Sequence, residues 1–337
     1  MAVAEPLRLA TWHVELSRKG PGLLLRDIRK GDDPQVAAVV EILAELQPDI
    51  LLLTDIDHDL TLLTLGALRD AIAAAGPEYP HLFAPPQNAG RDIGADLDGD
   101  GRLQEAEDAL GFGFFTGDGA MALLSRYPFG AAEDFSTLLW RDLPGNLMAG
   151  AALPEAAEDL VPLSSVAHWA VPVTLPGGAL SVLAMNATPP VFDGPEDRNG
   201  RRNHDEVIFW RHYLDGAFGP VPDHLALMGN ANLDPLDGEG RHDAIRTLLA
   251  DPRLQDPGPR DPAAAEEATP GQQGDPARDT ANWSEPVPGN LRVDYLLPSA
   301  GLRVLASGTL WPTPGSRAAE ASRHALVWVD LNWPPAE

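Results

Sequence analysis

The stretch HLALMGNANLDPLDGEGR, residues 224–241, carries the pattern on which the fold assignment rests. Its apolar run from His224 to Met228 has the composition of a buried β-strand, which Gly229 ends. The chain then turns through Asn230 and Asn232, so the strand delivers polar side chains to its carboxyl end. Polar residues on a loop at the end of a rigid strand are typical of a functional site. Both side chains here are neutral amides.

Short β-like runs alternate with helical segments along the whole chain. Besides 224–229, the candidate strands are residues 7–12, 50–54, 120–125, 168–175, 180–186, 293–298, 302–310 and 325–331. Helical patterns cover residues 33–46 and 59–75, a segment that begins at Asn203 with Glu206 as a capping-box partner, and about 240–250. Nine strands favour two sheets rather than one, and we expect helices to flank them.

The composition is that of a folded globular protein, with 44% apolar residues and 8 tryptophans in 337 residues. No run approaches the roughly 18 apolar residues that a membrane span needs. The 50 acidic and 24 basic residues give a formal charge of −26, which repels polyanions, so long nucleic acid is a poor candidate for a partner. The absence of cysteine excludes disulfides and thiolate metal sites.

Two segments lack regular periodicity. Residues 86–118 are polar and glycine-rich, and residues 251–290 are dominated by proline, glycine, alanine and aspartate, which is typical of a long surface loop. Strand patterns resume on both sides of each segment. We therefore expect a single domain over residues 1–337, with these two segments as insertions.

The first insertion contains DLDGDGRLQEAE, residues 96–107, which has the spacing of an EF-hand-type calcium loop. The metal-binding residues that this pattern predicts are Asp96, Asp98, Asp100, Arg102 and Glu107. No convincing helix enters the loop. We expect a structural Ca²⁺ that orders the insertion, and the alternative is a solvated acidic loop.

A calcium loop fits an extracytoplasmic location, where calcium is abundant, so a periplasmic or secreted protein is favoured over a cytoplasmic one. The sequence Ala2-Val3-Ala4 resembles the small-residue pattern that precedes a signal-peptidase cut. Chance in an alanine-rich chain explains this pattern about equally well.

Five stretches in fixed order resemble the endonuclease/exonuclease/phosphatase superfamily over nearly the whole chain. They are RLATWHVELS (8–17), DILLLTDIDHD (49–59), GAMALLSRYPF (119–129), LMGNANLDP (227–235), and LRVDYLLPS with ASRHALVWVDL (291–299 and 321–331). The resemblance implies an α/β (α+β) four-layer sandwich of the DNase I-like type. Two packed, mostly antiparallel β-sheets would be flanked by helices, with a divalent-metal phosphoesterase site at one end.

In that family the first motif ends in Asn, the second supplies a Glu that binds Mg²⁺, and a His precedes the long loop. A Gly-Asp-x-Asn turn then holds the nucleophilic water, and a Ser-Asp-His follows, whose His is polarised by the Asp of an Arg-x-Asp-Tyr strand. These residue types suit the chemistry, because Mg²⁺ prefers carboxylate oxygens and an attacking water needs a carboxylate to orient it.

Several positions of this chain depart from the family pattern. In this chain His13 stands where the family has Asn, Asp55 or Asp57 where it has Glu, and Asn186 where it has His. Asn230 replaces the Asp that orients the nucleophile, and Arg323 replaces the Asp of Ser-Asp-His. The positions that match the family are Asn232, Asp294 and His324. The amide of Asn230 cannot act as a base near neutral pH. Arg323 places a fixed cation where a metal ligand is expected, and would repel Mg²⁺ by roughly several kcal/mol.

Two hypotheses account for these departures. In the first, the metal site is degraded or repurposed, and the cleft binds an anionic small molecule or a protein partner, with Arg323 and His324 replacing the metal's positive charge. In the second, the protein is an active phosphoesterase on small phosphorylated substrates. The acids available to hold Mg²⁺, Mn²⁺ or Ca²⁺ are then Asp55, Asp57, Asp234 and Asp237. Taken singly, each departing residue also has an ordinary structural interpretation.

One further cluster, Arg198, Arg201 and Arg202, stands out in this acidic chain. It lies just before the predicted helix at Asn203, and arginines beside a helix N-terminus suit an anion. Pairing with nearby acids explains the cluster equally well; those acids are Asp193, Glu196 and Asp197.

Overall fold

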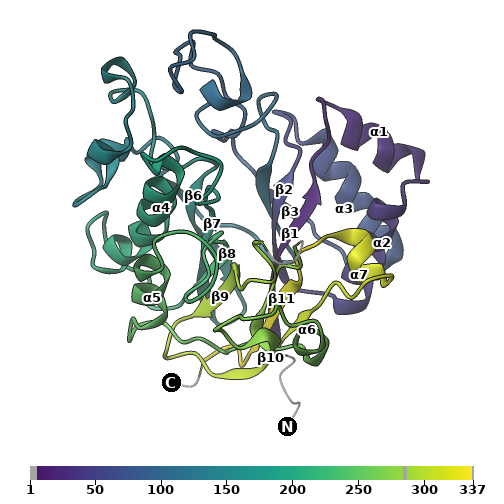
Figure 1. Cartoon of the computed structure of the whole chain (residues 1–337). Helices are drawn as coiled ribbons and strands as arrows, with labels where there is room; N and C mark the ends of the chain where they lie inside the picture. Colours follow the sequence, from purple (N-terminus) through teal and green to yellow (C-terminus); the bar gives the residue numbers. More distant parts are fainter. Residues whose placement is uncertain (1–5, 284–286, 336–337) are drawn as a thin grey trace.

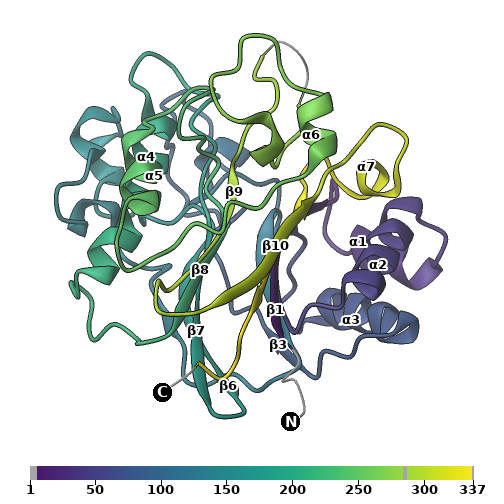
Figure 2. The same ribbon diagram turned by 90° about the horizontal axis from the view of Figure 1, so that it is seen from below.

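The computed structural model describes residues 6–283 and 287–335, which form two β-sheets packed face to face with helices outside them (Figure 1; Figure 2). The first sheet has the strand order β10-β11-β1-β2-β4-β3. Its strands are β1 (Leu7–Leu16), β2 (Ile50–Ile56), β3 (His81–Phe83), β4 (Ala120–Ser125), β10 (Val304–Leu310) and β11 (Leu326–Leu331). The pair β1 and β2 is parallel, and the other pairs in this sheet are antiparallel.

The second sheet has the order β5-β6-β7-β8-β9. Its strands are β5 (Glu133–Asp134), β6 (His168–Leu175), β7 (Gly178–Asn186), β8 (Leu225–Asn230) and β9 (Asp294–Pro298). Only β7 and β8 pair in parallel here. Both sheets are thus mostly antiparallel, as the family resemblance implied.

Helices cover the outer face of each sheet, which gives four layers (Figure 2). Those over the first sheet are α1 (Leu23–Lys30), α2 (Pro34–Leu46), α3 (Leu63–Ala75) and α7 (Arg317–Ala321), and those over the second are α4 (Arg198–Leu214) and α5 (Asp243–Leu249). The helix α2 begins as the sequence predicted, because the Asp33 carboxylate accepts from the main-chain N–H of Val36 and Pro34 follows it. In the described ranges, no helix combines the length and apolarity of a membrane span.

The sequence pattern follows the layers. Between the sheets, inward-facing side chains such as Leu9, Met121, Trp169, Val182 and Val327 form a shared core. Separate apolar clusters fill the space between each sheet and its helices. Both faces of the central strands are therefore buried, which explains why they read as nearly continuous apolar runs.

Two expectations about local structure were wrong. The helix α4 begins at Arg198 rather than Asn203, because Asn203 donates to the carbonyls of Thr188 and Ala231 instead of capping a helix. Glu206 makes no capping box and instead accepts from Ser165 and Thr188. The segment 251–290 also contains the short helix α6 (Pro262–Glu266) and a 3₁₀ turn at Pro276–Arg278, so it is more ordered than a plain loop.

Candidate functional site

The strand registers bring four of the predicted site positions together. Asn186, Asn230 and Asp294 are direct neighbours across β7, β8 and β9. The strand β1, which carries His13, packs against β8 and β9 from the other sheet. The site is therefore built where the ends of strands from both sheets meet.

His13 and Asn230 are joined by a hydrogen bond of 3.0 Å between His13 Nδ1 and Asn230 Nδ2. The orientation of the Asn230 amide is fixed, because its Oδ1 accepts from the main-chain N–H of Asn232 at 2.6 Å. An amide nitrogen can only donate, so His13 Nδ1 accepts and the ring proton of neutral His13 lies on Nε2; the hydroxyl of Thr54, 3.0 Å from the same Nδ1, then also acts as a donor. That atom is 3.6 Å from Oδ2 of Asp55. Burial, reinforced by the neighbouring His324, lowers the pKa of His13.

His324 and Asp294 form the second pair of the site. His324 Nδ1 lies 2.8 Å from Oδ2 of Asp294, and both side chains are buried. The His324 ring is 4.2 Å from the His13 ring and meets the edge of Trp283 at 5.2 Å. Because the carboxylate accepts at Nδ1, the Nε2 atom of His324 is the one available for proton transfer or for a bond to a ligand.

Arg323 does not lie free at the site. Its Nε donates to Oε1 of Glu15 at 2.8 Å, its Nη2 donates to the same oxygen, and its main-chain N–H donates to Oε2 at 2.7 Å. Although burial alone would raise it, these bonds hold the pKa of Glu15 at about 2. Ser322 adds a further hydrogen bond to Oε2 of Glu15 at 3.1 Å. The charge that Arg323 brings is thus largely neutralised.

Sequence reasoning missed Glu15. A signal for it existed, because Glu15 follows His13 by two residues and alternate residues of a strand share a face. The backbone around Glu15 is irregular, with φ at 51° and a register shift between β1 and β2 from His13 to Leu16. Only the fold reveals its pairing with Arg323, which is distant in sequence.

Asp55, the position expected to bind metal, accepts a hydrogen bond of 2.5 Å from Ser17. Ser17 Oγ accepts in turn from the main-chain N–H of Gly119 at 3.1 Å. Two carboxylates near His13 therefore already accept hydrogen bonds. Asp55 accepts from Ser17, and Glu15 accepts from Arg323.

The neighbouring carboxylate, Asp57, is buried. Its Oδ1 accepts from the main-chain N–H of Arg18 at 3.2 Å, and its Oδ2 has no hydrogen-bond partner within the described chain. Burial raises the pKa of Asp57 to about 7, and the nearby Asp118 adds to this effect. Without a cation nearby, Asp57 is therefore largely protonated below neutral pH.

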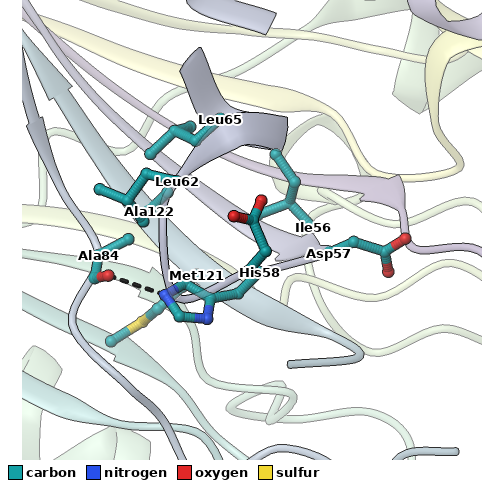
Figure 3. Close-up of a pocket in the computed structure, with 9 residues that line it drawn as sticks. Ile56, Asp57, His58, Leu62, Leu65, Ala84, Met121 and Ala122 are labelled. Atoms are coloured by element: carbon teal, nitrogen blue, oxygen red, sulfur yellow. Dashed lines mark hydrogen bonds between the residues drawn. The ribbon is translucent and has the colours of Figure 1, made fainter. Parts of the chain in front are cut away.

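Figure 3 shows the surroundings of Asp57, with its carboxylate pointing away from the His58 ring. His58 Nε2 bonds to the carbonyl oxygen of Ala84 at 2.9 Å. The adjoining cavity, of about 10 Å³, has room for a single water at most. This small cavity is thus no ligand site.

The other predicted residues have structural partners. Asn232 donates to the carbonyl oxygen of Ala187 at 2.7 Å, and Asn186 donates to that of Gly119 at 3.5 Å. Asp234 accepts from three main-chain N–H groups, and Asp237 accepts from two. These two acids shape the loops after β8, and neither has a contact with His13 in the described structure.

The three arginines of the cluster lie at the start of α4 and bind backbone carbonyls. Arg198 donates to Leu97 at 2.7 Å, Arg201 donates to Glu196 at 2.9 Å, and Arg202 donates to three carbonyl oxygens. Burial lowers the pKa of Arg202. Their observed contacts thus match neither of the two interpretations of this cluster, since these side chains tie the loops around α4 together.

The acidic loop of the first insertion forms one compact group. Within the described residues, the only set of three or more metal-ligating side chains whose ligand atoms lie within 4.8 Å of one another is Asp96, Asp98 and Asp108. Asp108 is buried and also accepts from the main-chain N–H of Leu97. This group could hold a metal ion. The structure does not bring Asp100 or Glu107 into it, and their side chains, like that of Arg102, are exposed.

Comparisons with solved structures agree with the observed fold. An endonuclease/exonuclease/phosphatase from Beutenbergia cavernae matches 97% of this chain and 72% of its own, with 19% identity and a TM-score of 0.55. A family protein from Leptotrichia buccalis matches 97% and 100%, with 14% identity and a TM-score of 0.57. A sphingomyelinase C from Streptomyces griseocarneus matches 97% and 99%, with 16% identity and a TM-score of 0.52. At these identities the likeness concerns the fold alone.

A comparison with proteins of curated function finds no significant match. The family model described as Endonuclease/Exonuclease/phosphatase family matches residues 25–324, which is most of the chain. Its members generally depend on a divalent metal. The match covers the ends of β2, β8 and β9 and reaches His324, so it includes most of the site described above. The chain belongs to the endonuclease/exonuclease/phosphatase family.

Proposed function

We propose that this protein does not hydrolyse phosphoesters and that the end of the sheets where its family carries out catalysis binds an anionic small molecule or a protein partner. The observation that carries the proposal is the state of Asn230. Its amide is buried and held between the Asn232 N–H and His13 Nδ1. A group in this position cannot take a proton from water.

The charge arrangement supports the same proposal. A divalent ion needs several oxygen ligands free to face it. Both oxygens of Glu15 already accept from Arg323, Oε1 from the guanidinium and Oε2 from the main-chain N–H, and Asp55 accepts from Ser17. We infer that the guanidinium serves as the cation of this site.

The donors that remain for an anion are few. Within the described chain, Arg323 Nη1 has no hydrogen-bond partner, and the Arg323 side chain is 65% exposed. The buried ring of His324 lies deeper, against His13. A small anion that reaches Arg323 would therefore meet one cation already paired with Glu15, which favours weak binding or a protein partner over tight binding of a phosphate.

The second candidate function is an active phosphoesterase on small phosphorylated substrates, with Mg²⁺ or Mn²⁺ held at Asp55. One observation favours it. His324 Nδ1 and Asp294 Oδ2 lie 2.8 Å apart and both side chains are buried, as expected of a His–Asp pair that takes part in catalysis. That pair alone can stabilise charge on a phosphoryl group but does not activate a water.

Hydrolysis assays separate the two. The native chain should release no nitrophenol from p-nitrophenyl phosphate or bis(p-nitrophenyl) phosphate with Mg²⁺, Mn²⁺ or Ca²⁺. Turnover that disappears in Asp294→Ala and in His324→Ala would establish the second candidate instead.

We also propose that the metal of the acidic loop is Ca²⁺ and that the protein works outside the cytoplasm. Three carboxylates on a glycine-rich loop suit a hard cation that takes oxygen ligands. The participation of Asp108 supports a structural role, because this residue joins the 96–98 loop to the buried part of the insertion.

A further inference from the structure

A groove of about 470 Å³ lies in the first insertion, between segment 104–109 and the turn 113–116. We call it the insertion groove. Its lining includes Gly90, Asp92, Glu105, Glu107 and Phe114. The volume is within the usual range for ligand pockets in proteins. None of its lining residues belongs to the site around His13 and Asn230.

Main-chain hydrogen bonds hold the walls of the insertion groove in place. The N–H of Gly90 donates to Gly111 at 2.8 Å, that of Leu110 donates to Arg91 at 2.9 Å, and that of Gly117 donates to Ala89 at 2.9 Å. The approach is so close that a Cβ at Gly90 would lie 1.8 Å from the Phe115 carbonyl oxygen. The walls of the groove are therefore fixed to one another by main-chain hydrogen bonds and close packing.

Large apolar side chains lie exposed on and beside the insertion groove. Phe114 is 72% exposed, Phe112 is 61% exposed, and their rings meet edge to face at 5.6 Å. Leu103, one residue before segment 104–109, is 56% exposed. Aromatic residues clustered on a surface are typical of places where a partner buries an apolar side chain.

The insertion that carries the groove is negatively charged. Residues 86–118 contain eight acidic and two basic residues, and five of the acids lie outside the proposed calcium group of Asp96, Asp98 and Asp108. One of the two, Arg102, already donates to Glu105 at 3.3 Å. Asp92 and Glu107 remain as acids on the lining. A partner that fits this surface needs positive charge as well as an apolar side chain.

We propose that the insertion groove docks a segment of a partner protein that carries basic side chains around an aromatic or aliphatic anchor. The anchor packs against Phe114, and the basic side chains pair with Glu107 and Asp92. This surface lies apart from the site around His13 and Asn230, so the proposal for that site and this one can fail separately, although the proposed calcium group lies in the same insertion as the groove.

The experiment is a fluorescence anisotropy titration of the full chain with a short labelled peptide of alternating arginine and tryptophan. A second peptide has glutamate in place of each arginine. The groove variants are Phe114→Ser and Glu107→Lys. Their matched controls are Phe192→Ser and Glu320→Lys, which alter an exposed apolar residue and an exposed acid outside the groove.

The basic peptide should bind the native chain, and the acidic peptide should not. Each groove variant should weaken binding by about tenfold, while the controls change it by less than about twofold. Added salt should weaken the native complex, because the charges are exposed.

Three results would overturn the proposal. The first is no binding of the basic peptide, or equal losses in groove and control variants, which would reflect general attraction to an acidic protein. The second is binding to phosphatidylcholine vesicles that Phe114→Ser abolishes, with no preference for the basic peptide. The third is a dimer in sedimentation that the same variant dissociates, which would make a second copy of this chain the occupant.

Discussion

Asn230 Nδ2 donates to His13 Nδ1 across the gap between the two sheets, at 3.0 Å. The bond requires a neutral His13, because a proton on Nδ1 would face the hydrogens of the amide. The residue that would be expected to orient a water is thus used to fix the tautomer of a histidine. This relationship between Asn230 and His13 is central to the proposed loss of hydrolysis.

The first prediction concerns this bond. Replacing Asn230 with Asp places a carboxylate against His13 Nδ1, which favours a protonated ring, so we expect the pKa of His13 to rise from its lowered value. Nitrogen-detected NMR of the imidazole ring measures both the pKa and the tautomer. An unchanged pKa in Asn230→Asp, with the ring proton still on Nε2, would contradict the assigned geometry.

The second prediction concerns Arg323 as the cation of the site. In Arg323→Ala the carboxylate of Glu15 is released, and its pKa should rise from about 2 toward the ordinary value. The variant should gain a Mn²⁺ site at Glu15 and Asp55 that the native chain lacks, measured by titration calorimetry.

The matched control is Arg317→Ala, which breaks ion pairs with Glu41 and Glu45 on α2. Arg317→Ala should lose no more than about 1 kcal/mol of stability, since exposed ion pairs contribute little, whereas Arg323→Ala should lose more, because it leaves the largely buried carboxylate of Glu15 without its cation. Equal Mn²⁺ binding by the native chain and by Arg323→Ala would show that the guanidinium does not replace a metal.

The third prediction concerns pH and the buried carboxylate of Asp57. With a pKa of about 7, native Asp57 keeps a proton between about pH 4 and pH 7 that the unfolded chain releases. Asp57 therefore lowers stability progressively as pH rises through that window, and its full cost is present above pH 7.

The variant Asp57→Asn removes this cost. It should stabilise the protein by about 1–3 kcal/mol at pH 8 and by almost nothing at pH 4, as denaturant unfolding would measure. Asp223→Asn, at an exposed acid, is the control. A gain from Asp57→Asn that is the same at both pH values would rule out the titration of Asp57 as its cause.

The fourth prediction concerns calcium. An ion bound only by the native state raises the melting temperature, so Ca²⁺ well above its dissociation constant should raise it by a few degrees, and a chelator should reverse this. The variants Asp96→Asn and Asp108→Asn should abolish the response. Glu107→Gln should keep it, because Glu107 lies outside the group of three ligands. A native melting temperature that neither calcium nor chelator changes would argue against the structural ion.

Much of the fold could be predicted from the sequence, because strong apolar runs mark the central strands. The runs at β4 and β6 have the predicted bounds, and β1 and β2 are longer than predicted by a few residues. The strands β3 and β5 were missed, since two or three residues are too few to show a period. The helix α1 was missed as well; its bounds are Leu23–Lys30.

The candidate site was predictable only in part. The family resemblance implied that His13, Asn230, Asp294 and His324 share one site, and the structure places these four residues together at the strand ends. The partners that decide their chemistry could not be predicted in this way. Glu15 binds Arg323 through a contact between residues far apart in sequence, and this contact depends on the irregular end of β1.

The measurement that tests the central claim most directly compares hydrolysis of bis(p-nitrophenyl) phosphate by two proteins in the presence of Mg²⁺ or Mn²⁺. One is the native chain, and the other carries His13→Asn, Asn186→His, Asn230→Asp and Arg323→Asp. The account predicts no turnover by the native chain and measurable turnover by the fourfold variant, which regains a base and a free carboxylate at the metal position. Turnover by the native chain that depends on Asp294 and His324 would contradict it.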